Sequence, residues 1–479
     1  MPGVYVTTQT RSGPSAPNIA PSGQVFMAGQ AERGTVTQPV LVRNIAEFTA
    51  EFGGRTTYSH LYDNVKVFFE EGGAQAWIAR VVGAAASTGT VTLDDRQTPA
   101  EDTLKIDAAS PGAWSDDLDI VVEDLAGSTT QISVVFDGET VETFTGDTVA
   151  DLVEALGNSS YVVVTNIGSD GVAPANKPAE GTFHLSAGTD DRNNIDADDY
   201  TSALDLFDVS LGAGAVAIPG VGATVHSALL DHARSTNRRI AILSHSETAT
   251  KSDLTTAADA LNSEYGGLFG PWVQVATETG TKYTSPEGYV AACRNRAHAE
   301  TGPWRVPAGQ IAIARSLVGL KYDYTRADTD ELDAAKVNTI RYVAGTIRLY
   351  GWRSVSDDTT NYAMLSGRDV LNSILVEAEA RMEQYVFQTI DGKGQLLASI
   401  GGTLVGILEP MRNAGGLYER YAANGTLLDR GYVIDSGANV NTLETLSNNE
   451  VRAQVSVRVA PSAAMISVTI VKVGLLSNL

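Results

Sequence analysis

The 479-residue chain contains a single cysteine, Cys293, so no disulfide can form within it. Such a composition suits folding in a reducing cytosol. No apolar run is long enough to span a bilayer, and no positively charged, apolar leader opens the sequence. We therefore expect neither a membrane-inserted segment nor a signal peptide. No cluster of Cys and His residues supports a zinc site.

Basic residues are also scarce, with 34 Lys and Arg against 57 Asp and Glu, which gives a formal net charge of −23. Nothing supplies the basic face that duplex nucleic acid or an anionic membrane surface requires, so we expect direct contact with neither. Hydrophobic content of 43% and charged content of 19% are ordinary for soluble globular proteins. The length predicts more than one domain, each with a sizeable core.

The end of the chain holds two β-rich runs. From 451 to 459 apolar residues alternate with polar ones, which is the period of a strand with one buried and one wet face. After a break at 460–464 that contains Pro461, a second run covers 465–473. A β-branched strand at the end of a chain needs a sheet to join, either in its own subunit or in a neighbour.

The first 24 residues are too rich in Pro, Ser and Gly to form a packed element. Only the short piece around Tyr5 is suited to an extended strand. Two interpretations stay open from the local sequence: a frayed terminus, or a tethered strand that reaches a neighbour's sheet.

The remainder predicts a mixed α/β, multidomain protein. Strands are expected at 25–28, 39–42 and 76–82, with a helix at 61–71 that Gly72 and Gly73 end. Residues 189–301 alternate strand and helix in the order expected of βαβ units. In this region the expected strands are 215–219, 239–244 and 272–276, and the expected helices are 223–235, 252–261 and 286–299. Ser252 and Asp253 are expected to cap the second of these helices.

Between them, composition shifts to β-rich sequence, and we predict an inserted β-sandwich-like domain at 88–188. Its expected strands are 91–93, 103–106, 118–122, 131–136 and 161–164, with one helix at 148–156 and a hairpin turn at Asp137-Gly138. Five carboxylates here raise the question of calcium, but their spacing fits no twelve-residue calcium loop, and acidic loops of this kind are usually solvated faces. They are Asp94, Asp95, Asp116, Asp117 and Asp119.

The best case for an enzyme is the turn Gly220-Val221-Gly222, which follows a strand and opens a helix as a dinucleotide site does. The third glycine is missing, Pro219 precedes the turn, and no acidic residue ends the following strand. His226 and His232 lack the spacing of two ligands on one helical face, Asp231 beside His232 has no nucleophile, and Ser244 lacks a nucleophile elbow. We therefore predict no catalytic, metal or cofactor-binding residue, with a nucleotide-binding α/β enzyme as the alternative.

Two helices are expected near the C-terminus. The first, 369–388, has an apolar stripe, with Glu377 and Arg381 as an i,i+4 pair on its outer face. The stripe consists of Leu371, Ile374, Leu375, Ala378, Met382 and Tyr385. The second, 395–408, carries Gly401, Gly402 and Gly406. Each interior glycine costs about 1 kcal/mol relative to alanine, so we expect another backbone to approach closely there.

Several motifs together resemble the contractile tail sheath proteins of bacteriophages and related injection machines. The C-terminal ones are 285–291 (Ser-Pro-Glu-Gly-Tyr-Val-Ala), 302–309 (Gly-Pro-Trp-Arg-Val-Pro-Ala-Gly), 337–341 (Val-Asn-Thr-Ile-Arg) and the strand pair around Ala460-Pro461. The N-terminal ones are 2–6, 47–53, 67–73 and 77–81. The motif 350–354 (Tyr-Gly-Trp-Arg-Ser) departs from the family's Trp-Gly-Ala-Arg-Thr, so detailed contacts are not carried over there.

The resemblance implies a structural subunit, not an enzyme. Such a subunit polymerises as hexameric rings in a helical sheath around a tail tube protein, and contracts to drive the tube through a cell envelope. It further implies baseplate and tail terminator proteins as partners, assembly in the host bacterial cytoplasm, and a place in the virion tail. The C-terminal domain would face the tube, which makes the glycine-bearing helix a candidate for that contact.

Combined with the resemblance, the sequence predicts six segments: an N-terminal arm (1–24), the first part of the α/β core (25–87), the insert (88–188), a central α/β domain (189–301), a C-terminal inner domain (302–464) and a C-terminal strand arm (465–479). The arms would pair with neighbouring subunits. The predicted strand-arm residues are Val4, Tyr5, Val6, Ile466, Val468, Ile470, Val471 and Val473, and the predicted hinge residues are Pro14, Pro17, Pro21 and Pro461.

Overall fold

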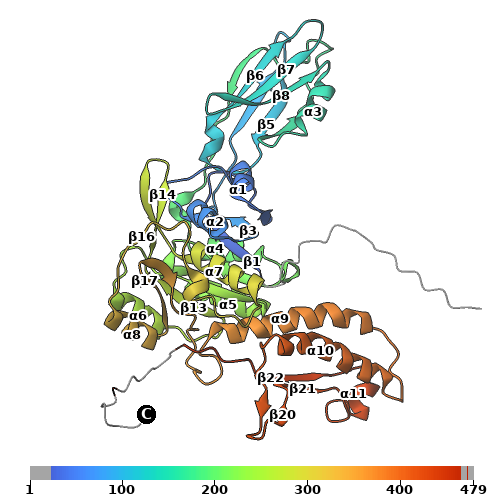
Figure 1. The fold of residues 1–479 in the computed structure, drawn as a ribbon. Helices are drawn as coiled ribbons and strands as arrows, with labels where there is room; N and C mark the ends of the chain where they lie inside the picture. The colour runs from blue at the N-terminus through green and yellow to red at the C-terminus, as the bar shows by residue number, and fades with distance from the viewer. Residues whose placement is uncertain (1–22, 465–471, 473–479) are drawn as a thin grey trace, which may run out of the picture.

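The computed structural model describes residues 23–464 and residue 472. Three bodies follow one another from top to bottom in Figure 1: the inserted domain (88–188), a central α/β body, and a C-terminal body (365–464). The mixed α/β, multidomain class is confirmed. The strand arms predicted at 2–6 and 465–473, apart from residue 472, lie outside the described residues, as do the hinge residues Pro14, Pro17 and Pro21.

An eight-stranded sheet forms the centre of the molecule. Its spatial order is β18 (Thr346–Leu349), β17 (Val337–Val343), β13 (Gly266–Gly270), β12 (Arg239–Leu243), β11 (Gly214–Ala217), β1 (Gln24–Gly29), β3 (Ala76–Arg80) and β2 (Val40–Val42). The six inner strands are parallel, and β18 and β2 are antiparallel edges. Parallel strands are buried on both faces, which is why β11, β12 and β13 are buried along their whole length.

Helices cover both faces of this sheet. One face packs against α1 (Ile45–Phe52), α2 (Leu61–Glu70) and α7 (Glu287–Glu300), and the other against α4 (Ala197–Asp205), α5 (His226–Thr236), α6 (Lys251–Asp259) and α8 (Arg326–Ala334). A small sheet of β14 (Val273–Thr277), β15 (Gly280–Thr284) and β16 (Gly319–Leu320) lies beside it. Helix α7 is buried on most of its surface, since it contacts the sheet, α2 and the short turn at 309–312.

The inserted domain consists of two antiparallel sheets that enclose their own core. One contains β4 (Thr90–Asp94), β5 (Asp102–Ala108) and β9 (Val162–Asn166); the other contains β10 (Gly181–His184), β6 (Leu118–Asp124), β7 (Thr130–Phe136) and β8 (Glu139–Gly146). Helix α3 (Val149–Leu156) contributes Leu152 and Leu156 to that core. The predicted turn at Asp137-Gly138 joins β7 to β8, and both residues have positive φ.

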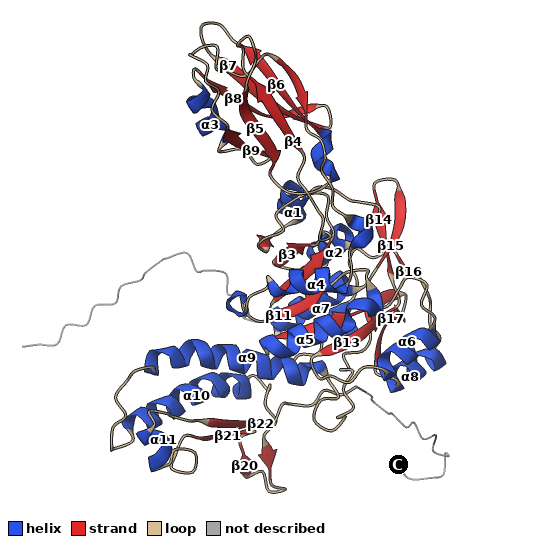
Figure 2. Ribbon diagram, turned by 180° about the vertical axis from the view of Figure 1, so that it is seen from behind, coloured by secondary structure: helices blue, strands red, loops and turns tan. Residues whose placement is uncertain are grey.

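The C-terminal body consists of α9 (Leu365–Met382), α10 (Gln395–Asn413), α11 (Leu443–Ser447) and two small sheets. The sheets pair β19 (Arg420–Tyr421) with β20 (Leu427–Asp429), and β21 (Tyr432–Asp435) with β22 (Gln454–Val457). Helix α9 begins buried against the central body and extends outward with α10 beside it (Figure 2). The i,i+4 pair of Glu377 and Arg381 is present, at 2.8 Å.

Several expected elements differ from the structure. Residues 272–276 were expected in the βαβ series, but β14 lies in the side hairpin, and the parallel strand at this place is β13. Helix α6 begins earlier than predicted, because Thr250 caps it in a capping box with Asp253. Strand β22 covers only part of 451–459. Strands β8 and β10 were not predicted.

The proposed boundary at residue 302 does not coincide with a break in the fold. Strands β17 and β18 follow it in sequence but join the central sheet through β13. Because the central sheet needs these two strands at its edge, the C-terminal body begins only at α9.

Candidate functional site: the glycine turn, the acidic loops and the free strand edges

The Gly220–Gly222 turn lies at the carboxyl end of β11, where open α/β sheets bind ligands. Both glycines have φ of +80°, which explains why glycine occupies each position. A Cβ on Gly220 would lie 2.6 Å from the ring of His60, and that ring packs edge-on against Trp272. Side chains therefore fill the space against Gly220, so packing accounts for the glycine without a phosphate.

The polar residues around this turn bind one another. Ser244 donates its hydroxyl to the Glu287 carboxylate at 2.5 Å, and burial raises the pKa of Glu287. The His226 Nε2 lies 2.6 Å from the Ser244 carbonyl oxygen. Glu287 was quoted only as part of the motif 285–291, since nothing in the local sequence marks its side chain as buried.

The other histidine of α5 also has a structural role. Arg239 donates to His232 Nε2 at 2.8 Å, and burial together with the Arg239 charge lowers the pKa of His232 to about 4. Asp231, its neighbour in sequence, pairs instead with Arg234 at 2.9 Å. His232 therefore remains neutral at physiological pH, and none of the contacts found among the described residues places a nucleophile beside it.

Replacing Gly220 and Gly222 by alanine is expected to lower the melting temperature, because alanine is strained at positive φ and a Cβ at position 220 would overlap His60. We expect native mass spectrometry of the wild type to give the mass of the protein alone. Gly280→Ala is the control, since it also has positive φ but has open space around it. A stoichiometric nucleotide in the wild-type spectrum that the double variant loses would revive the enzyme alternative.

The acidic residues of the inserted domain accept hydrogen bonds from different donors and do not converge on one point. Burial alone would raise the pKa of Asp95, but hydrogen bonds from the Gln97 and Ser169 side chains, together with the N–H groups of Glu101 at 3.1 Å and Gln97 at 3.0 Å, lower it. Asp116 accepts the Gly188 N–H at 2.9 Å. In the part of the chain that the structure describes, no group of three His, Cys, Asp or Glu residues is placed to hold a metal ion.

The glycines of α10 have no close backbone neighbour in the described residues. A Cβ on Gly401 would meet only the Ser436 hydroxyl at 3.0 Å, one on Gly402 would meet nothing within 4 Å, and one on Gly406 would reach only Arg381 at 4.0 Å. No backbone among residues 23–464 therefore makes the close approach that was expected at these glycines. A contact with another chain stays a prediction.

The β21–β22 pair is the strongest candidate for an assembly site. Within the described residues neither strand pairs with a third, so the pair presents two strand edges. Ile434 and Val455 pack against α10, whereas Val433 is 63% exposed. A two-stranded sheet is marginally stable by itself, and open edges are templates for further strands.

The chain leaves this sheet directly towards the predicted C-terminal arm. Val459 forms a bridge with Leu417, and the Ala460 N–H donates to Gly416 at 3.0 Å. The hinge residue Pro461 follows in exposed, non-repetitive structure. The structure therefore brings one predicted hinge residue to the edge of the candidate assembly site.

Among the described residues no helix is both long enough and apolar enough to cross a membrane.

No protein-family model and no curated protein matches the sequence. Solved structures do match. A sheath tail protein from Listeria innocua superposes with a TM-score of 0.62 at 12% identity, over 87% of this chain and 89% of its own.

Two cryo-EM structures match over nearly the whole length. The anti-feeding prophage baseplate in the contracted state contains a chain with a TM-score of 0.60 at 16% identity, covering 100% of this chain and 99% of that one. The contracted PVC sheath complex, from an extracellular contractile injection system, contains one with a TM-score of 0.55 at 14% identity, covering 98% and 97%. The fold that the sequence motifs implied is therefore confirmed.

Proposed function

We propose that this chain, which has the fold of contractile tail sheath proteins, is the repeating subunit of such a sheath. The observation that supports this function most directly is the likeness to chains of contracted sheath and baseplate assemblies along almost the entire length. The subunit polymerises around a tail tube and contracts to drive the tube through a cell envelope. It has no catalytic role.

The β21–β22 pair supplies the connection between subunits in this proposal. The predicted arms, 2–6 and 465–473, add to its open edges in neighbouring copies, by main-chain hydrogen bonding of the kind used in strand addition. Each subunit body then rotates about the segments 11–23 and 460–464 while the strand connections persist. The residues that form the added strands are the strand-arm residues predicted from the sequence.

The partners follow from the same proposal. Copies of the chain form stacked hexameric rings, the tail tube protein lies inside them, and baseplate and terminator proteins bind the two ends. Assembly takes place in the host bacterial cytoplasm, and the finished sheath belongs to the tail of a phage or an injection particle.

Negative-stain microscopy of the purified chain tests this function. We expect tubes or rings, and we expect no cofactor absorbance in the same preparation. Isolated globules that carry the absorbance of a bound cofactor would overturn the proposal in favour of the nucleotide-binding alternative.

Replacing 88–188 by a short Gly/Ser loop is expected to leave tube formation intact. The two chain segments that connect the insert to the central body already lie side by side, because Ser87 and Thr189 exchange backbone hydrogen bonds of 2.9 and 3.0 Å. The inserted domain also has a core of its own, so its removal opens no cavity in the central sheet. Tube counting on the folded variant is the measurement; a folded variant without tubes would place the insert inside the lattice.

A further inference from the structure

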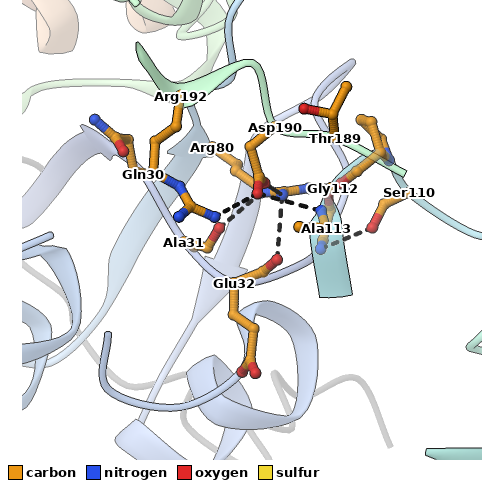
Figure 3. Close-up of polar contacts among 12 residues, drawn as sticks. Gln30, Ala31, Glu32, Arg80, Ser110, Gly112, Ala113, Thr189, Asp190 and Arg192 are labelled. Atoms are coloured by element: carbon orange, nitrogen blue, oxygen red, sulfur yellow. Dashed lines mark hydrogen bonds and ion pairs between the residues drawn. The ribbon is translucent and has the colours of Figure 1, made fainter. Parts of the chain in front are cut away.

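Arg80, the last residue of β3, connects the central sheet to the inserted domain. Its side chain is fully buried, and Figure 3 shows it at the meeting point of three segments. It donates to three carbonyl groups of the loop 31–34, which follows β1. These are Ala31 at 3.1 Å, Glu32 at 3.2 Å and Gly34 at 2.9 Å.

The same guanidinium also reaches a loop of the insert and the chain segment that returns from the insert to the central body. It donates to the Pro111 carbonyl at 2.7 Å and to the Asp190 carboxylate at 2.6 Å. The second oxygen of Asp190 accepts from Arg192 at 2.6 Å and from the Ala113 N–H at 3.3 Å. One buried ion pair therefore holds a loop of the insert, the returning chain and the central body together.

The loop that carries Gly112 packs closely against this ion pair. Gly112 has a φ of +137°, and a Cβ there would lie 2.8 Å from both Arg80 Nη2 and Asp190 Oδ1. Nearby, the Gly34 N–H donates to the Ser110 hydroxyl at 3.0 Å. These contacts fix the loop 110–113 relative to β1 and β3.

Apolar packing across the junction is incomplete by comparison. A cleft of about 450 Å³ separates the edge strand β2 from Trp114 and Tyr161 of the insert. A second cleft of about 300 Å³ lies beside 189–194. The core of the insert is separate from the two cores of the central body. Two domains joined in this way ordinarily move relative to one another.

We infer that the Arg80–Asp190 pair locks the orientation of the inserted domain, so that this domain and the central sheet move as one rigid body. Replacing Arg80 removes the donor to four backbone carbonyl groups and leaves Asp190 with Arg192 as its ion-pair partner. Neutralising Asp190 leaves the buried Arg80 charge without its counter-ion, and either change drives the joint open. The inference concerns the isolated subunit and does not depend on the proposed function.

Spin labels test the lock on the whole chain kept as dispersed subunits. Exposed Ala126 in the insert and exposed Ser252 on α6 are changed to cysteine and labelled. Cys293 stays unlabelled, because it is buried and burial raises the pKa of its thiol to about 12. We expect one narrow distance peak between the labels in the parent, and loss of that single peak with Arg80→Lys.

Arg239→Lys is the matched control. Arg239 is also fully buried and donates to backbone carbonyls of Phe207 at 2.5 Å and Asp208 at 2.7 Å, but it lies inside the central body. This variant should lose stability and keep the narrow peak. Asp190→Asn keeps the size of the side chain and should broaden the distribution of label distances as Arg80→Lys does. It replaces Arg80→Lys as the test if that variant does not fold. A broad parent distribution, or narrow peaks in the folded junction variants, would overturn the lock.

Discussion

A chain truncated after Ala460 is expected to melt at the temperature of the full-length subunit and to form no tubes. The C-terminal body is complete at this point, since Ala460 makes the bond to Gly416 and residues 461–464 are exposed. If residues 465–473 belong to a neighbour's sheet, the subunit core does not depend on them. Circular dichroism melting and tube counting on the same preparation measure the two effects.

Val468→Pro is expected to reproduce the truncation with one substitution. Proline removes a backbone donor and clashes within a sheet, so a strand that carries it cannot add to the β21–β22 edge. Val468→Thr is the matched control, because threonine keeps the donor and the β-branched shape. Removing residues 2–6 should act in the same way if both arms share one sheet. A large loss of melting temperature for Val468→Pro, with tubes still forming, would place the strand inside its own subunit.

Local patterns were sufficient where a short segment determines its own structure. In β22 the alternation predicted which side chains face inward: Val455 and Val457 are half-buried, whereas Gln454 and Ser456 are exposed. The glycine pair after α2 ends that helix where Gly72 adopts a φ of +95°. These features are determined by residues close together in the sequence, so the local sequence was sufficient to predict them.

Strand β13 shows where local patterns fail. Its sequence, Gly-Gly-Leu-Phe-Gly, lacks the β-branched residues that mark a strand. The glycines are required by distant neighbours: a Cβ on Gly266 would lie 2.5 Å from Leu230, and one on Gly267 would lie 2.7 Å from the Arg353 carbonyl oxygen. Crowding by other parts of the chain, which no local pattern records, explains the missed strand.

The buried polar contacts were not predictable for the same reason. Arg80 and Asp190 lie 110 positions apart, and the inserted domain separates them in sequence. An isolated Arg at the end of a strand is ordinarily solvent-exposed, so only the folded chain identifies its partners. The boundary predicted between residues 188 and 189 lies next to Asp190, but it did not identify the ion pair.

Asp369→Asn is expected to lower the free energy of unfolding by about 3–5 kcal/mol, the usual effect of removing one partner from a buried ion pair. Asp369 lies near the start of α9, which joins the central and C-terminal bodies, and its side chain is fully buried. Arg294 of α7 donates to one carboxylate oxygen through Nη2 at 2.7 Å and Nε at 3.1 Å. The His298 Nε2 lies 3.6 Å from the other oxygen. Urea denaturation of the dispersed subunit measures the loss.

The dependence on pH distinguishes this ion pair from a simple packing effect. Burial alone would raise the pKa of Asp369, but the Arg294 charge and the His298 contact outweigh it and hold the pKa below its ordinary value. A carboxylate with a lowered pKa in the folded state stabilises the protein above its unfolded pKa of about 3.9, and this contribution is lost as the pH falls through the folded pKa. The difference between wild type and Asp369→Asn should therefore be full at neutral pH and shrink in acid below about pH 4.

Asp231→Asn is the control for a carboxylate outside the core. Asp231 pairs with Arg234 on the same helix and its side chain is 69% exposed, so the change should stay within about 0.5 kcal/mol. If Asp369→Asn cost no more than this control, the joint between α7 and α9 would depend on apolar contacts instead. Val370, Ile374 and the Trp304 ring would then be the residues that hold the C-terminal body to the rest of the molecule.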